Sequence, residues 1–208
     1  MIISEKPDAA LRIANALADS KVKIKLDNKI KYYEITHKGK NIVVVCAVGH
    51  LFNLAEKEKN GWNYPVFDLI WVPIYTLSKS AAFSKSYIET IKNQSKDCNE
   101  FYVGTDKDDE GELIGANVLK FIINKKDGKR MEFSTLTKED LIKAFENAKP
   151  HLDFPLIEAG ETRHYLDWVW GINLSRALTL AVKSTGSFKL LSSGRVLGPA
   201  LKIIVVRD

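Results

Sequence analysis

The feature that most constrains the fold of this chain is an acidic run at residues 105–112, which read Thr-Asp-Lys-Asp-Asp-Glu-Gly-Glu. The run follows a short β-prone segment at 101–104 and precedes residues 113–123, whose apolar side chains recur at helical spacing. A strand is therefore predicted to end, and a helix to begin, at a cluster of carboxylates. The cluster consists of Asp106, Asp108, Asp109, Glu110 and Glu112.

Two interpretations of this acidic run are open. Carboxylates so close together repel one another, so the cluster is unfavourable unless positive charge neutralises it. Carboxylate oxygens without His or Cys beside them suit a hard cation such as Mg²⁺, and the carboxyl end of a strand is where α/β sheets bind ligands. The alternative is a solvated first helical turn, where the helix dipole favours negative charge.

A second charged element lies at the start of the chain. Glu5 and Lys6 follow a minimal strand and precede a proline-started helix, which is predicted over 8–19. Glu5 would therefore also lie at the carboxyl end of a strand. It faces the acidic run if the first strand neighbours the strand at 101–104. A carboxylate that only caps the helix is the alternative.

The remaining pattern predicts an α/β domain followed by helices. Turn signals at Asp27-Asn28 and Lys38-Gly39 predict a hairpin-like stretch over 21–48. Residues 41–48 are continuously apolar, as in a strand that is buried on both faces. Further helices are predicted at three places, which are residues 80–95, a segment capped by Thr137 that continues to Ala148, and residues 156–180.

The aromatic segment at 52–78 shows no regular pattern. Exposed aromatic rings there could stack on nucleic-acid bases. Burial statistics favour packing of these rings under a loop instead.

Two further residues allow a functional and a structural interpretation each. His50 follows Gly49 at the end of the buried strand, on the ligand-bearing side of the sheet. It could contact phosphate or move a proton near neutral pH, although a lone His is more often structural. Arg195, after Gly194, suggests a phosphate contact, and a local ion pair with Asp167 is the alternative.

Composition limits the functional classes. The 208 residues allow one or two domains. The net charge of +5 comes without a basic tail, so nucleic-acid binding would depend on Lys and Arg placed in a groove. Cys46 and Cys98 lack CxxC spacing, which predicts a reduced, intracellular protein without a zinc site. No signal peptide or long apolar stretch is present, so no membrane partner is expected.

Six motifs, in family order over nearly the whole chain, resemble those of type IA DNA topoisomerases, in particular the archaeal topoisomerase I and topoisomerase III branch. One acidic motif would be weak evidence, whereas six ordered motifs are specific. The motifs are Ser-Glu-Lys-Pro at 4–7, Val-Gly-His-Leu at 48–51, Asp-x-Asp-x-Glu-Gly-Glu at 106–112, Arg-Met-Glu-Phe-Ser-Thr-Leu-Thr at 130–137, Arg-His-Tyr-Leu-Asp at 163–167 with Gly-Ile-Asn-Leu-Ser at 171–175, and Leu-Ser-Ser-Gly-Arg-Val-Leu-Gly-Pro-Ala-Leu at 191–201.

This resemblance implies an α/β fold with two parts. Residues 1–150 would form a Toprim domain with a Rossmann-like, mostly parallel sheet, and residues 151–208 would begin a mainly helical domain that grips DNA. Pro150 and Pro155 mark the predicted boundary. Many family members carry Pro and Arg between the acids, where this chain has Lys107 and Asp109, so the local charge balance differs.

The resemblance also implies residue roles. Glu5 would be the catalytic glutamate, and Lys6 would neutralise the scissile phosphate. Mg²⁺ would be bound by the acidic triad Asp106, Asp108 and Glu110. The implied DNA contacts are His50, Arg130, Arg163, Asp167, Ser192 and Arg195.

The activity implied is relaxation of negatively supercoiled DNA by transient single-strand cleavage, strand passage and religation, with Mg²⁺ and without ATP. The family's nucleophile is a tyrosine far downstream, and none of the seven tyrosines here lies in a segment that resembles its motif. We therefore expect the amino-terminal part of a larger, monomeric enzyme that acts on single-stranded DNA in the cytoplasm, associated with the nucleoid. A self-contained Toprim nuclease or primase-related protein is one alternative. A non-catalytic DNA-binding module is another.

Overall fold

The computed structural model describes residues 1–59 and 61–207 and divides the chain into two compact units. The first unit comprises Met1–Asn53 and Pro73–Gly160, and the second comprises Leu54–Val72 and Glu161–Asp208. The domain boundary at residue 150 stays a prediction. The structure adds that residues 54–72 belong with the second unit, although they lie far from its other residues in sequence.

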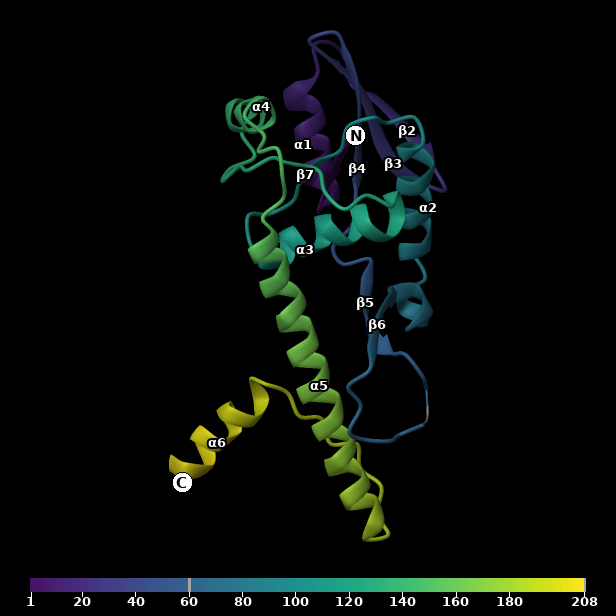
Figure 1. The fold of residues 1–208 in the computed structure, drawn as a ribbon, viewed down its shortest axis with the longest axis vertical. Helices are drawn as coiled ribbons and strands as arrows, with labels where there is room; N and C mark the ends of the chain where they lie inside the picture. The colour runs from purple at the N-terminus through teal and green to yellow at the C-terminus, as the bar shows by residue number, and fades with distance from the viewer. Residues whose placement is uncertain (60, 208) are drawn as a thin grey trace. The chain divides into compact units, whose positions relative to one another are not determined.

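The first unit is built on a six-stranded mixed sheet, in the order β2-β3-β4-β1-β7-β8 (Figure 1). Strand β1 pairs in parallel with both β4 and β7, and β7 pairs in parallel with β8. Strands β2, β3 and β4 form an antiparallel meander. The predicted α/β class is therefore confirmed. The strands are β1 (Ile2–Ser4), β2 (Lys23–Asp27), β3 (Ile30–His37), β4 (Lys40–Cys46), β7 (Tyr102–Gly104) and β8 (Lys129–Arg130).

Both predicted hairpin turns are confirmed. Asn28 and Lys29 have φ angles of 48° and 68°, and Asp27 pairs with Ile30 across the turn. Lys38 and Gly39, with φ angles of 47° and 77°, make the second turn. Two successive residues with positive φ give a turn whose twist matches that of the flanking strands, which is why Asn and Gly are favoured there.

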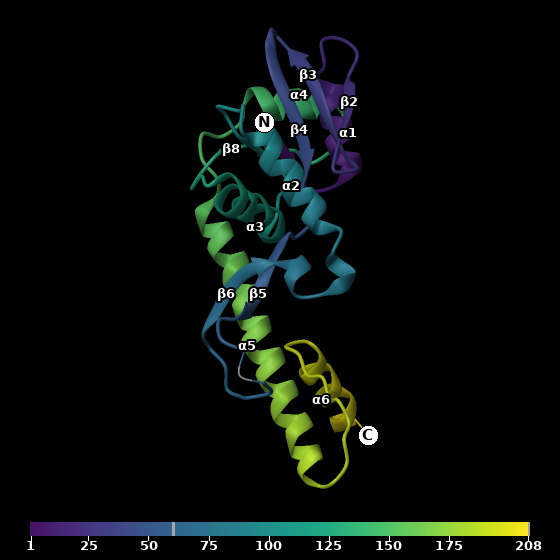
Figure 2. The same cartoon turned by 90° about the vertical axis from the view of Figure 1, so that its right-hand side faces the viewer.

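Helices cover both faces of this sheet (Figure 2). Helices α1 (Pro7–Leu17) and α4 (Lys138–Glu146) pack on one face, where Ile2, Ile13 and Val44 are completely buried. Ile3 and Val103 point to the other face, because successive side chains of a strand alternate. That face is covered by α2 (Ser84–Ser95) and by α3 (Asp109–Val118), which continues as the π-helical turn η3 (Leu119–Ile123). Thr137 caps α4 as predicted, by accepting a bond from the Asp140 N–H.

The segment at 52–78 contains regular structure that the sequence did not reveal. Strand β5 (Phe52–Glu56) pairs with β6 (Leu69–Pro73), and two short 3₁₀ turns, η1 (Ile74–Thr76) and η2 (Lys79–Ala81), follow. The expectation that aromatic rings pack under this loop is wrong for three of them. Trp62, Tyr64 and Phe67 have 46%, 49% and 68% of their surface exposed.

The second unit is dominated by helix α5 (Phe154–Ser184), which begins in the first unit, and by α6 (Leu197–Arg207). The Asn173 amide holds the aromatic segment against α5, since it accepts from the Val66 N–H and donates to the Val66 carbonyl. Within residues 1–59 and 61–207, no helix combines the length and the apolar character needed to cross a membrane.

Candidate functional site

The register of the sheet brings the two charged elements together. Strands β1 and β7 are parallel neighbours, with Ser4 opposite Gly104. Because both strands end at the same edge, Glu5 and Lys6 emerge beside Thr105 and Asp106. The condition stated from the sequence, that the first strand neighbours the strand at 101–104, is therefore met.

Lys6 is the positive centre of this edge. Its Nζ lies 2.7 Å from Asp106 Oδ2 and 3.3 Å from Glu5 Oε1. The hydrogen bond to Asp106, followed by the charge of Glu5, raises the pKa of Lys6. The Lys6 side chain is 60% exposed while that of Glu5 is 15% exposed, so the ammonium faces solvent above a largely covered carboxylate. A solvated ammonium of this kind is accessible to an incoming anion.

Asp108 has the structural role that the alternative interpretation foresaw. It is the N-cap of α3, and its Oδ1 accepts a 2.7 Å bond from the Gly111 N–H. A capping carboxylate is stabilised by the unpaired N–H groups and the dipole of the helix. Its second oxygen is the atom through which it could also bind a cation.

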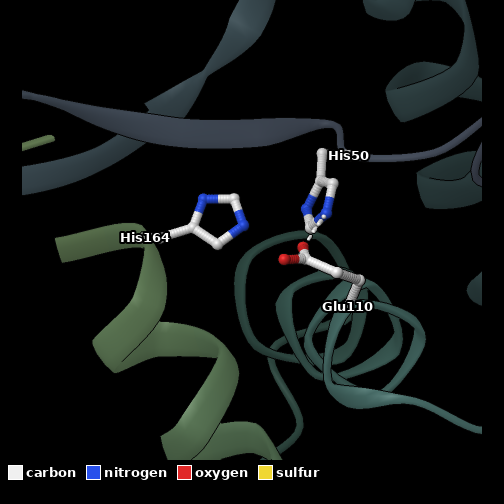
Figure 3. A group of neighbouring side chains, drawn as sticks. All are labelled: His50, Glu110 and His164. Atoms are coloured by element: carbon white, nitrogen blue, oxygen red, sulfur yellow. Dashed lines mark hydrogen bonds and ion pairs between the residues drawn. The ribbon is translucent and has the colours of Figure 1, made fainter. Parts of the chain in front are cut away.

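His50 faces Glu110, which belongs to the acidic run (Figure 3). His50 Nε2 lies 2.7 Å from Glu110 Oε2, and both side chains are half-buried. The loop that carries His50 is fixed to the end of β1, since the Gly49 N–H donates to the Glu5 carbonyl. His50 thus lies at the carboxyl edge of the sheet, where the sequence put it, and its ring is held against Glu110.

The thiol of Cys46 forms hydrogen bonds that hold the loop carrying His50 to the end of β1. It donates to the Glu5 carbonyl and accepts from the Val48 N–H. Burial raises the pKa of Cys46 to about 11, so the thiol is protonated at neutral pH and serves as a packing group.

Arg130 requires a correction, because its guanidinium lies in the interior of the first unit. Arg130 and Glu112 form an ion pair in which both side chains are 1% exposed, with Nε donating to Glu112 Oε2 over 2.5 Å. Nη2 donates to the Asp106 carbonyl over 2.8 Å. The predicted phosphate contact is therefore not compatible with the position of Arg130. The sequence showed a basic residue in a motif near the acids and could not show that it points inward.

The acidic run also depends on a close backbone approach that only glycine allows. A Cβ atom at Gly111 would lie 2.2 Å from the Asp106 carbonyl oxygen. Real Cβ atoms do not come so near to a backbone oxygen, so a side chain here would displace the run. Sequence reasoning noted Gly111 only as part of the acidic motif and missed this requirement.

The predicted residues of the second unit lie on α5 and the segment that follows it. Arg195 Nε donates to Asp167 Oδ1 over 2.6 Å, and about 45% of each side chain is exposed. The hydrogen bond from Arg195 lowers the pKa of Asp167. The local pair considered in the sequence is therefore present. Arg163 and Ser192 are exposed. The hydroxyl groups of Ser175 and Thr179 on α5 form hydrogen bonds with the backbone N–H and C=O groups of Ser193 and Leu191, respectively.

The acidic edge has side-chain oxygens that suit a divalent cation, but these oxygens do not converge on one point. Asp106, Asp108 and Glu110 present oxygen ligands only, as Mg²⁺ prefers. Over the described ranges 1–59 and 61–207, these three residues do not form a set of ligand atoms within 4.8 Å of one another. Their oxygens are directed instead to Lys6, the Gly111 N–H and His50. The donor chemistry fits, and binding would require these side chains to exchange partners.

Comparison with known proteins identifies the class of this fold and site. Residues 1–136 match the family model of the Toprim domain, and residues 151–208 match that of DNA topoisomerase. The Toprim match covers more than half of the chain, so the chain belongs to the Toprim family. Toprim domains bind metal ions.

The similar proteins are DNA topoisomerases. The chain is 48% identical to DNA topoisomerase 1 of Methanocaldococcus jannaschii and 47% identical to that of Pyrococcus furiosus, in both cases over 100% of this chain, but over only 27% and 20% of those proteins. The chain thus spans about a quarter of the length of these relatives. Full-length topoisomerase I from Thermotoga maritima shares the fold, with a TM-score of 0.57 over 85% of this chain and 25% of its own, at 21% identity.

Proposed function

We propose that this chain supplies the catalytic acidic edge of a type IA DNA topoisomerase, which relaxes negatively supercoiled DNA through a transient single-strand break. The observation that carries the proposal is the contact of Lys6 with both Glu5 and Asp106 at the carboxyl edge of the sheet. It combines a solvent-facing cation, a covered carboxylate and a group of oxygen ligands, which are the parts that phosphoryl transfer needs.

Lys6 and Glu5 have separate roles in the proposed reaction. Lys6 binds the scissile phosphate, and its Nζ stabilises the charge that develops on the phosphate oxygens. Glu5 transfers a proton between its carboxyl group and the 3′-oxygen of the cleaved strand, as general acid in cleavage and as general base in religation. The nucleophile is a tyrosine outside residues 1–208. Its phosphodiester bond to the 5′-phosphate preserves the bond energy, so religation needs no ATP.

Asp106, Asp108 and Glu110 would hold Mg²⁺, mostly through water molecules, because this ion keeps much of its hydration shell. The bound ion would supply positive charge next to the DNA phosphates. His50 orients Glu110 through the 2.7 Å contact between Nε2 and Oε2 and stays a candidate contact to DNA. Lys6 would break its contact with Asp106 as it binds the phosphate. The Asp106 carboxylate would then be available to bind Mg²⁺.

The single strand would be held by exposed residues of the second unit, for which Arg163, Asp167, Ser192 and Arg195 are the candidates. Arg suits phosphate because its planar guanidinium makes two parallel hydrogen bonds. Few such contacts are available. The affinity for a single strand should therefore fall only moderately with salt, with a slope of roughly −0.7 per neutralised phosphate.

The test of the proposed reaction is relaxation of a negatively supercoiled plasmid by the complete enzyme that carries this chain. Glu5→Gln should slow relaxation by about 100-fold or more, as expected when a general acid is lost, and Lys31→Gln on the hairpin should not. Relaxation at the wild-type rate by Glu5→Gln would refute the role of Glu5.

The alternative of a self-contained nuclease has a separate test. The 208-residue chain, incubated with a labelled single-stranded oligonucleotide and Mg²⁺, should bind it and leave it uncut. Cutting that disappears in Asp108→Ala would establish the nuclease instead. A covalent adduct with DNA formed only by a longer protein would support the topoisomerase.

A further inference from the structure

The buried guanidinium of Arg130 donates hydrogen bonds to backbone carbonyls at the start of the acidic run. Besides the ion pair with Glu112, Nη1 donates to the carbonyls of Val103, Thr105 and Met131 at 3.2, 2.9 and 2.7 Å, and Nη2 donates to that of Asp106 at 2.8 Å. Val103 lies in β7, and the next two acceptors along the chain are the first residues of the run. The guanidinium therefore fixes the path of the chain where the strand ends and the ligands begin.

Asp106 is held from three sides as a result. Its carbonyl lies between the Arg130 guanidinium and Gly111, where no Cβ would fit. Its carboxylate contacts Lys6. Movement of the Arg130 side chain would release the carbonyl and let the carboxylate shift with it.

Glu112 extends this connection to helix α5. Its Oε2 accepts from Arg130, and its Oε1 accepts a 2.8 Å bond from the Asp153 N–H. Asp153 is the residue before α5 and caps it, since its Oδ1 accepts from the Leu156 N–H and its carbonyl from the Ile157 N–H. One buried carboxylate thus joins the start of α5 to the guanidinium that holds the acidic run.

We propose that Arg130 and Glu112 are positioning residues for the metal-binding run and tie its geometry to the start of α5. The inference rests on the proposed function of the run. Stability alone does not require such a pair, because neutral side chains of similar volume often replace a buried ion pair without loss. The four carbonyl acceptors do require the fork of donors that only Arg offers.

The decisive variant is R130M/E112Q in the 208-residue chain. Met fills much of the volume of Arg, Gln keeps an acceptor for the Asp153 N–H, and no buried charge remains unpaired. The variant loses the ion pair between Arg130 and Glu112 and the donors to the carbonyls of Val103, Thr105, Asp106 and Met131. The matched control is L17A, which opens a cavity at the opposite end of α1 from Lys6, at a residue that is 1% exposed.

Two readouts separate positioning from stability. Affinity for Mn²⁺, measured by electron paramagnetic resonance, should fall in R130M/E112Q by about 10- to 100-fold, as it does when groups that orient metal ligands are removed. Amide hydrogen exchange at residues 105–108 should accelerate in this variant without any metal. L17A should lower the thermal midpoint and leave both readouts at the wild-type value.

Wild-type Mn²⁺ affinity together with wild-type exchange in folded R130M/E112Q would overturn the proposal. If this variant does not fold, R130K takes its place, because Lys keeps the charge but cannot reach the four carbonyls. Wild-type values for R130K would overturn the proposal equally. Failure of the proposed metal function is distinguishable, since Mn²⁺ would then bind equally to the wild type and to D106N/D108N, while the exchange readout would still judge the positioning role.

Discussion

Two arginine–carboxylate pairs in different units show how burial decides what the same chemistry does. Arg130 with Glu112 and Arg195 with Asp167 have nearly equal Nε–O distances of 2.5 and 2.6 Å. Both arginines stand in motifs that the resemblance connects with DNA. The first pair is 1% exposed on each side, whereas the second is 44% and 45% exposed. One is a fixed part of the interior, and the other is open to exchange with a ligand.

The difference follows from solvation. Charges removed from water lose several kcal/mol of hydration, so a buried pair persists only when its remaining donors and acceptors are satisfied. Arg130 meets this condition through four backbone carbonyls. An exposed pair such as Arg195 with Asp167 is screened by water and salt and contributes little to stability, so little is lost when a phosphate displaces the carboxylate. Of the two arginines, only Arg195 remains a candidate to contact DNA.

The largest expected effect is that of Arg130→Met alone. It leaves Glu112 charged and unpaired in the interior, which should lower the free energy of unfolding by about 3–5 kcal/mol. Urea unfolding followed by circular dichroism measures it. A loss below about 1 kcal/mol would mean that water reaches Glu112 and that the two pairs differ less than their exposure indicates.

Gly111→Ala tests the other support of the Asp106 carbonyl. The added Cβ would meet that oxygen at 2.2 Å, and the strain should cost about 1–3 kcal/mol and weaken Mn²⁺ binding. Gly104→Ala is the matched control, because its Cβ would meet its nearest neighbours at an ordinary 3.5–3.7 Å. Equal stability losses in the two variants would indicate that the close approach at Gly111 has no special role.

Arg195→Ala should hardly change stability, because an exposed ion pair is screened by solvent, but should weaken binding of a single-stranded oligonucleotide. The salt dependence should lose roughly 0.7 from its slope if Arg195 neutralises one phosphate. Fluorescence anisotropy at several salt concentrations measures this slope. An unchanged slope would leave Arg195 with its local pair as its only role and would make the two arginines alike.

The smallest effect concerns the pKa of Asp167. The bond from Arg195 lowers this pKa from its ordinary value of 3.8. Because the folded-state pKa lies below the unfolded one, the pair stabilises the fold above the unfolded value, and this contribution is lost as pH falls through the folded-state pKa. In Arg195→Ala, a nuclear magnetic resonance titration should show the pKa of Asp167 rising toward 3.8. No change would mean that the pair does not persist in solution.

Much of the local structure followed from the sequence. The turns at Asp27-Asn28 and Lys38-Gly39, the cap at Thr137 and the strand-to-helix junction at the acidic run are dictated by residues within a few positions of one another. The sequence did not reveal strands β5 and β6, because they are short and lie in an aromatic segment without a regular pattern. Neither Phe-Asn-Leu-Ala-Glu of β5 nor Leu-Ile-Trp-Val-Pro of β6 shows the strict alternation of apolar and polar residues that indicates a strand.

The sequence by itself determined which groups could form a site, since its motifs contain the carboxylates, the lysine and the arginines. Only the tertiary structure decided their roles. It turned Arg130 inward to Glu112 and the carbonyls of the acidic run, and it left Arg195 at the surface beside Asp167. The physical reason is that the environment of a charged side chain depends on residues distant in sequence, such as Asp153, which lies 41 positions after Glu112 and donates its N–H to it.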